Sequence, residues 1–205
     1  MDIVLIGYIA LAATEKTLLI KESELNSRFS VSYLNKAKRA CLDFTYNEKE
    51  IKEVLNTSGV KRYELIELSD TGVFGGLWKL SENIVKRAKD DTDVLFKAPD
   101  KGLKVNVEDI PVRQETIEIL EYFDANPYTY PSKGTFLLAC DNANVVLNAM
   151  SANGTNASVI GITDSTNERV IINGETKRFL TPDDRLLKDE QDLTNNIKSL
   201  RKELL

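Results

Sequence analysis

The residues best suited to chemistry form a glycine-rich turn, Ser69 to Gly76, between the apolar run 63–68 and a helical pattern. Glycines at a helix start let the backbone approach a ligand, and the N–H groups left unpaired there favour an anion. Ser69 and Thr71, which lie just before Gly72, add hydroxyl groups to the turn. The turn therefore predicts a phosphate site, although an ordinary capped helix explains the same pattern. Its spacing is neither that of a Walker loop nor that of a Rossmann loop.

A second turn, Tyr130 to Thr135, precedes another apolar run. Ser132, Lys133 and Gly134 offer a hydroxyl, an ammonium group and a main-chain N–H, which are groups that bind phosphate. They add to the first site only if the fold brings the two turns together. Taken alone, the second turn fits a solvated loop.

Acidic residues near the first turn suggest a cation. Glu67 and Asp70 flank Ser69, and two carboxylates beside a phosphate are suited to Mg²⁺. Asp90, Asp91 and Asp93 form a second group, which is more typical of a helix end and an exposed loop. The candidate metal ligands are therefore Glu67 and Asp70.

The composition excludes several kinds of chemistry and surface. The 205 residues include no His, which removes Ser–His and Cys–His relays and His-ligated zinc, so no catalytic residue is assigned. Cys41 and Cys140 lack metal-type spacing, and we expect reduced, buried thiols. The formal net charge of −5 argues against a broad surface for nucleic acid or anionic lipid.

Strands and helices alternate along the chain and would position both turns. Apolar, β-branched runs predict strands at 2–9, 63–68, 94–97, 103–107, 135–140, 157–162, 169–172 and 175–180. Helical spacing predicts helices through 18–25, at 31–42 and 47–59, from Gly72 to about 87, after Pro111, and after Asp141 as a cap. Asn173-Gly174 predicts a hairpin. We expect an α+β fold, with a mixed β-sheet covered by helices in a three-layer α/β/α arrangement.

The first apolar run, Ile3 to Ala13, invites comparison with a signal peptide. It follows Asp2 rather than a basic residue, and it is too short to span a bilayer. We therefore expect a cytoplasmic protein with a buried first strand and no membrane association.

The last segment, 182–205, carries Leu or Ile at 186, 193, 197, 200 and 204 among many charges. This spacing fits a short two-stranded seam between chains. It fits equally an amphipathic helix that packs on its own domain.

Several segments together resemble the C-terminal domain of the AIR synthase superfamily, in its hydrogenase-maturation branch. They are Gly72–Glu82, Asp109–Leu120, Asn126–Tyr128, Ser132–Ala139, Val159–Ile162 and Arg169–Gly174, in that order and spacing. Asp2–Leu5 and Ala10–Thr14 resemble the start of the same domain. The resemblance implies one domain over 1–181, clearest over 61–181, followed by an amphipathic helix over 182–205.

The resemblance also implies cofactors and partners. Members of the superfamily use ATP, bind Mg²⁺ through acidic residues of an N-terminal half, and dimerise mainly through that half. We expect this protein to lack that half. ATP and Mg²⁺ are then cofactors implied only by resemblance, and the implied partners are a second copy of the chain and a separately encoded N-terminal half.

The first turn departs from the family pattern His-Asp-x-Thr-Glu-Gly-Gly. Ile66 stands in place of the His, Glu67 and Asp70 exchange the two carboxylate lengths, and Thr71 replaces one glycine. The chain also ends in Leu205 rather than in the cysteine through which the hydrogenase-maturation enzyme works. These changes are compatible with a phosphate site but argue against a finely placed catalytic geometry.

Two functions are consistent with these observations. The first is a stand-alone domain that is non-catalytic by itself and either binds a nucleotide or phosphorylated metabolite as a homo-oligomer or completes an active site with a partner. The second is an ATP-dependent enzyme, for phosphoryl transfer or for amide or amidine formation, whose site is shared between subunits. The second would use Glu67 and Asp70 for metal and Ser132 and Lys133 for phosphate. The lost His favours the first.

Overall fold

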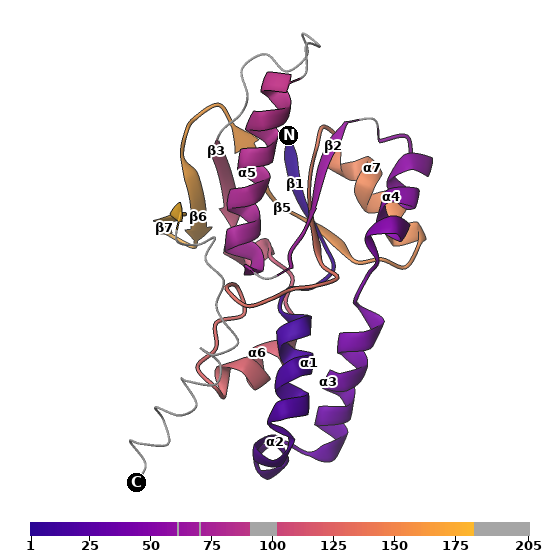
Figure 1. The fold of residues 1–205 in the computed structure, drawn as a ribbon, viewed down its shortest axis with the longest axis vertical. Helices are drawn as coiled ribbons and strands as arrows, with labels where there is room; N and C mark the ends of the chain where they lie inside the picture. Colours follow the sequence, from indigo (N-terminus) through magenta and orange to yellow (C-terminus); the bar gives the residue numbers. More distant parts are fainter. Residues whose placement is uncertain (61, 70, 91–101, 183–205) are drawn as a thin grey trace.

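The computed structural model describes residues 1–60, 62–69, 71–90 and 102–182. Figure 1 shows the order of the elements. The strands are β1 (Asp2–Ile6), β2 (Tyr63–Glu67), β3 (Gly102–Asn106), β4 (Phe136–Cys140), β5 (Ala157–Asp164), β6 (Arg169–Asn173) and β7 (Thr176–Phe179). The helices are α1 (Leu11–Ile20), α2 (Glu22–Arg28), α3 (Val31–Asp43), α4 (Glu48–Thr57), α5 (Gly72–Asp90), α6 (Gln114–Glu121) and α7 (Ala143–Ala152), with a 3₁₀ turn, η1, at Val107–Asp109.

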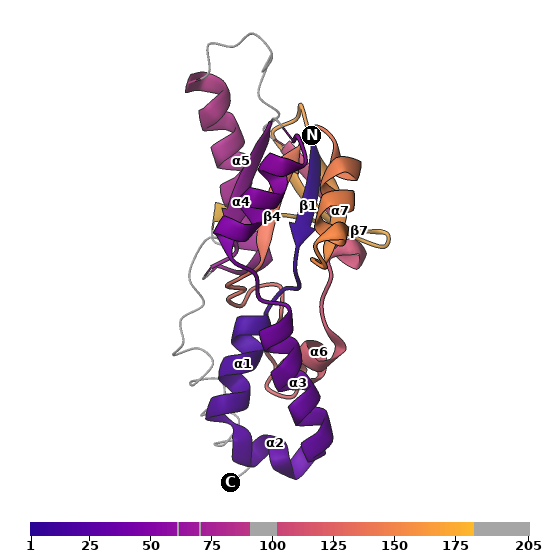
Figure 2. The same ribbon diagram turned by 90° about the vertical axis from the view of Figure 1, so that its right-hand side faces the viewer.

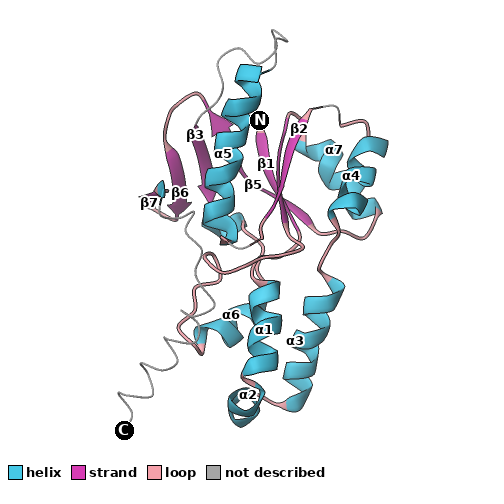
Figure 3. Ribbon diagram, viewed as in Figure 1, coloured by secondary structure: helices cyan, strands magenta, loops and turns pink. Residues whose placement is uncertain are grey.

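The strands form one mixed sheet in the order β2-β4-β1-β5-β3-β6-β7 (Figure 3). Only the β3–β6 pair is parallel among the strands that the structure describes, and the other neighbours run antiparallel. The predicted α+β class with a mixed sheet is therefore confirmed. The Asn173-Gly174 turn joins β6 to β7, as the hairpin signal predicts.

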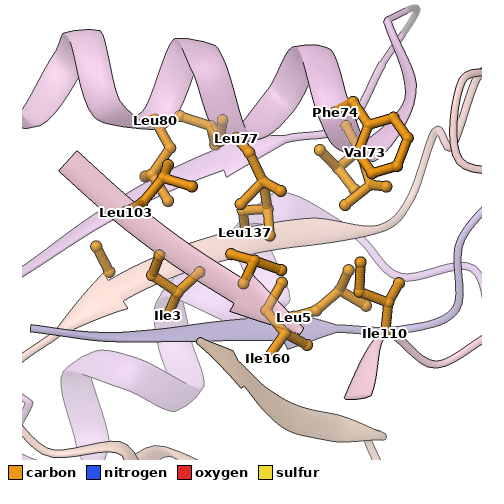
Figure 4. Packing of buried hydrophobic residues seen from close by; sticks show 14 of the residues in the cluster. Ile3, Leu5, Val73, Phe74, Leu77, Leu80, Leu103, Ile110, Leu137 and Ile160 are labelled. Atoms are coloured by element: carbon orange, nitrogen blue, oxygen red, sulfur yellow. The ribbon is translucent and has the colours of Figure 1, made fainter. Parts of the chain in front are cut away.

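The centre of the sheet is covered by helices on both faces. Successive side chains of a strand point to opposite sides, so the apolar residues of β1 need a covering layer on each face. Ile3 and Leu5 of β1 pack with α5 in one core cluster, and Val4 and Ile6 pack with α4 and α7 in another. Figure 2 shows α5 on one side of the sheet and α7 on the other. Figure 4 shows the first cluster, in which Leu77 and Leu80 of α5 lie over the sheet residues. The three-layer arrangement holds around β1 and β4.

Four helices lie beyond the end of the sheet instead of covering its faces. Helices α1, α2, α3 and α6 form this lobe in Figures 1 and 2, around a core of their own that includes Leu18, Leu25 and Ile119. Ala10, which lies between β1 and α1, has a left-handed φ of 59° immediately before α1 begins. The sequence patterns marked these helices without indicating that they pack on one another.

Several element bounds differ from the sequence expectation. The helix expected through 18–25 is divided at Lys21 into α1 and α2. Asn142, not Asp141, caps α7, since its side chain accepts from the N–H of Val145. The strand expected at 94–97 and the segment 183–205 lie outside the described residues.

Two simpler expectations concern the thiols and the membrane. Cys41 and Cys140 are both free and buried, as predicted, and burial raises the pKa of Cys41 to about 12 and that of Cys140 to about 11. Of the helices in the described ranges, none has the length and apolar character needed to cross a bilayer.

Candidate functional site

The two turns singled out from the sequence lie against each other. The main-chain N–H of Ser132 donates to the carbonyl oxygens of Leu68 and Ser69, each at 3.0 Å, and the N–H of Leu68 donates to the carbonyl of Thr135 at 2.8 Å. Strands β2 and β4, which border the turns, are paired neighbours in the sheet. The geometric condition for a shared anion site is therefore met.

The start of α5 is already occupied by the chain itself. The carbonyl oxygen of Tyr128 accepts from the N–H of Val73 at 3.0 Å and from that of Phe74 at 3.4 Å. These are N–H groups that a capping side chain or an anion would otherwise bind. Tyr128, rather than Ser69 or Thr71, therefore supplies the acceptor at this helix start.

Gly72 is needed for this close approach. Its φ is +63°, and a Cβ atom built there would lie 2.6 Å from the carbonyl oxygen of Tyr128 and 2.7 Å from the carbonyl carbon of Thr129. The glycine thus admits a backbone segment to the helix start. In a phosphate site, the same freedom would admit a ligand.

The second turn is held in the same internal way. Glu67 Oε1 accepts from the N–H of Gly134 at 2.9 Å. Ser132 Oγ accepts from the N–H of Ala10 at 2.8 Å and donates to the carbonyl of Tyr130 at 3.2 Å. Since Ser132 is fully buried, its hydroxyl connects the turn to the start of the helical lobe.

The remaining candidate residues are at or near the surface. Ser69 and Lys133 are exposed, and Thr71 is partly exposed. Asp70, the second proposed metal ligand, lies outside the described residues, as do Asp91 and Asp93. The groups that these turns offer to a ligand are therefore those of Ser69, Thr71 and Lys133.

The contribution of Tyr128 was missed in the sequence analysis. A main-chain carbonyl carries no residue-type signal, and Tyr128 is remote in sequence from Val73. Asn126-Pro127 marks a turn, and Asn126–Tyr128 is one of the segments that carry the resemblance, but neither signal indicates a contact with the start of α5. In the structure Asn126 Oδ1 accepts from the N–H of Tyr128 at 3.0 Å and so fixes the peptide.

Comparison with known proteins identifies the fold. No protein-family model and no curated protein matches the sequence. Among solved structures, hydrogenase maturation protein HypE in complex with ATP matches with a TM-score of 0.62 and 13% identity, over 94% of this chain and 52% of that one. The HypE–HypF complex matches with a TM-score of 0.56 and 16% identity, over 88% and 52%.

A second kind of protein shows the same likeness. Thiamine-monophosphate kinase from Stenotrophomonas maltophilia K279a matches with a TM-score of 0.53 and 13% identity, over 83% of this chain and 49% of that chain. These neighbours are members of the AIR synthase superfamily, so the resemblance predicted from the sequence is confirmed as a likeness of fold. The chain spans about half the length of the structures that it matches.

Proposed function

We propose that this domain is non-catalytic by itself and completes a nucleotide- or phosphate-binding site together with a second copy or a separately encoded partner. The observation that carries this proposal is the Tyr128 carbonyl, which takes up the N–H groups of Val73 and Phe74. A phosphate would have to displace a main-chain segment to reach them. Glu67 is likewise engaged by Gly134.

The turns still offer groups that suit a supporting role. The Lys133 ammonium and the hydroxyls of Ser69 and Thr71 lie outside the internal hydrogen bonds described above and can reach a phosphate held mainly by another chain. HypE has been solved with ATP and with HypF. For this chain, ATP with Mg²⁺ and a partner protein are therefore the ligand and the class of assembly to test first.

The proposal also assigns the protein to the cytoplasm. Residues 3–6 of the first apolar run form the buried strand β1, with each side chain fully inaccessible to solvent. This use of the run supports a structural role over that of a secretion signal.

A nucleotide titration of the purified protein tests the binding part of the proposal. ATP with Mg²⁺ should raise the melting temperature, because a ligand at about 100 times its Kd stabilises by about 2.7 kcal/mol. Lys133→Gln should reduce the shift, and Lys49→Gln, which removes an exposed charge from α4, should not. If ATP raised the melting temperature of both variants equally, Lys133 would not be part of the binding site.

Turnover separates the proposal from the shared-site enzyme. The protein alone, with ATP and Mg²⁺, should hydrolyse less than about one ATP per second. Faster turnover that Glu67→Gln or Asp70→Asn abolishes would favour the enzyme instead.

Light scattering tests self-association. The intact chain should form a dimer, whereas a version ending at Asp184 should be monomeric, because the apolar stripe of 186–204 is then absent. If both versions were monomeric, a second copy would be excluded, and only a separately encoded partner could complete the binding site.

A further inference from the structure

The α7 side of the sheet is covered by helices at one end only. The core cluster on this side, which includes Val4 of β1 and residues of α4 and α7, contains no residue of β3, β6 or β7 among those described. Helix α7 packs on β1 and β5. In Figure 1, α4 and α7 lie toward the β2 edge of the sheet, whereas β6 and β7 lie at the opposite edge. Among the described residues, no helix therefore builds a core on the α7 side of β3, β6 and β7.

The strand pairing sets out a row of side chains across this uncovered half. The Cα partners along the row are Asp2, Ile162, Lys104, Val170 and Phe179, which belong in turn to β1, β5, β3, β6 and β7. Partners in neighbouring strands share a face of the sheet. The carboxylate of Asp2 accepts from the N–H of Ala143 at the start of α7, so the whole row lies on the α7 side.

Apolar side chains of this half of the sheet are exposed. Ile162 is 48% exposed, Phe179 is 55% exposed, and Val159, on the same side of β5, is 38% exposed. Lys104 interrupts the row, but its ammonium lies 2.9 Å from Oδ2 of Asp164, so its charge is paired. Exposed apolar side chains gathered on one face mark an interaction surface. We call the α7 side of β5, β3, β6 and β7 the open sheet face.

The chain continues from this face into a segment with a matching apolar stripe. Residues 183–205 lie outside the described residues, and they begin shortly after β7, which carries Phe179. The pattern of 186–204 predicts an amphipathic helix with one apolar side, formed by Leu193, Ile197, Leu200 and Leu204. This stripe would be about 16 Å long at about 1.5 Å per residue, and the four strands of the open sheet face span about 14 Å. One such helix is therefore long enough to cover the face.

The connection between β7 and this segment is short. The chain is held in the sheet at Leu180, whose N–H donates to the carbonyl of Arg169 at 2.9 Å. Pro182 disfavours a helical conformation of the residue before it, and residues 183–185 alone separate it from Leu186. A short connection of this kind favours exchange of the following element between two copies over its return onto the same chain.

We propose that the open sheet face of one copy is covered by residues 186–204 of a second copy, and that the exchange is mutual. The inference rests on the self-association proposed above and names the surface that receives the apolar stripe. A chain ending at Asp184 has no covering helix to exchange, which is why it should be monomeric. In the dimer, the exchanged helix completes the layer that α4 and α7 begin over the other half of the sheet.

Cross-linking tests this contact and its source. Ile162→Cys is combined in turn with Ile197→Cys and with Leu200→Cys, and each intact double variant is treated with a short bismaleimide. At least one of the two should form a covalent dimer, in which peptide mass spectrometry joins position 162 to the stripe. Native Cys41 and Cys140 are buried and should stay unlabelled. A cross-link within one chain, or none in either variant, would overturn the proposal.

Charged substitutions test how far the dimer depends on the open sheet face. Ile162→Asp and Phe179→Asp should each raise the Kd of the dimer at least about tenfold, because the covering helix would bury an unpaired carboxylate. Both side chains are about half exposed within one chain, so each variant should keep its fold, which circular dichroism checks. Leu19→Asp is the control, since Leu19 of α1 is 72% exposed in the helical lobe. This control should leave the Kd unchanged.

These measurements also separate the inference from the proposed self-association. The intact chain can be a dimer and the version ending at Asp184 a monomer while both Asp variants dimerise like the unmodified protein. In that case self-association stands, and the open sheet face is not its surface. If the intact chain is monomeric in light scattering, both proposals are overturned. A raised Kd in the Asp variants, together with a cross-link between chains, supports the exchange.

Discussion

The carboxylate of Glu67 accepts a hydrogen bond from the main-chain N–H of Gly134, with Oε1 2.9 Å from the nitrogen. Glu67 was proposed as a metal ligand and Gly134 belongs to the second turn proposed for ligand binding, yet this contact joins the end of β2 to that turn. It connects the end of β2 to the residues just before β4. A carboxylate used in this way acts first as part of the fold.

Removing this acceptor should therefore destabilise the protein. Glu67→Ala leaves the buried N–H of Gly134 without its partner, which is expected to lower the free energy of unfolding by about 1–3 kcal/mol. Glu67→Gln keeps an amide oxygen at that position and should lose less. Urea denaturation measures both, with the exposed Glu53→Ala on α4 as a control expected to stay within about 0.5 kcal/mol. If Glu67→Ala left the free energy of unfolding unchanged, the structural role of Glu67 would be contradicted.

Ser132→Ala provides a second test of internal use against ligand binding. Its hydroxyl accepts from the N–H of Ala10, and both residues are fully buried. Truncation should lower the free energy of unfolding by about 1–3 kcal/mol, since the N–H has no water to replace the lost partner. Ser69→Ala, at an exposed position in the other turn, should change stability by less than about 0.5 kcal/mol. If Ser132→Ala kept full stability while reducing a nucleotide-induced shift, Ser132 would be a ligand group.

Gly72→Ala should be more damaging than another glycine substitution with the same backbone requirement. Gly72 and Gly59 both have positive φ, at +63° and +80°, so each alanine carries a conformational cost of about 1–2 kcal/mol. Only at Gly72 does the added Cβ meet main-chain atoms of the 128–129 segment, whereas Gly59 has nothing within 4 Å. The difference in melting temperature between the two variants isolates that contact. Equal effects would mean that the Tyr128 segment moves aside readily.

The location of both turns could be predicted because short-range signals mark them. Glycine and hydroxyl residues just after an apolar run indicate a strand, a turn and a helix start. The start of the helix predicted over 47–59 follows from a signal of the same kind, and in the structure the side chain of Asn47 accepts from the N–H of Lys49 at 2.8 Å. Resemblance to a known superfamily then placed the turns on one fold, and the structure pairs them as expected.

The use of the turns could not be predicted, because it depends on contacts between distant segments. Ser132 and Ala10 are 122 residues apart, and the Tyr128 carbonyl has no side-chain signature. Lys177 and Arg178 lie in a strand whose four residues are all exposed. Nothing in that short pattern indicated that the guanidinium of Arg178 would lie over the ring of Phe74 in α5. Sequence patterns identify the polar groups that could bind a ligand, whereas the fold decides which of these groups are already hydrogen-bonded within the chain.

The last prediction concerns a buried carboxylate in the helical lobe. The side chain of Glu115 is 2% exposed, and its Oε1 lies 2.6 Å from Nζ of Lys36 and its Oε2 3.3 Å from Nε of Arg113. Burial alone would raise the pKa of Glu115, but the hydrogen bonds from Lys36 and Arg113 outweigh it and hold the pKa below the ordinary value of 4.5. The folded protein therefore binds a proton at this site less readily than the unfolded chain does.

The sign of the pH effect follows from this lowered pKa. The contribution of Glu115 to stability is present above about pH 4.5 and is lost as the pH falls through the folded-state value. Glu115→Gln should lower the free energy of unfolding at pH 7 by about 1–3 kcal/mol, because the hydrogen bonds to charged partners weaken. The difference in free energy of unfolding between Glu115→Gln and the unmodified protein should become smaller near pH 3. Glu121→Gln, an exposed change on the same helix, should neither lower the free energy of unfolding at pH 7 nor change its pH dependence. If the difference between Glu115→Gln and the unmodified protein stayed constant from pH 7 to pH 3, the ion pairs of Glu115 would be excluded as the cause of that difference.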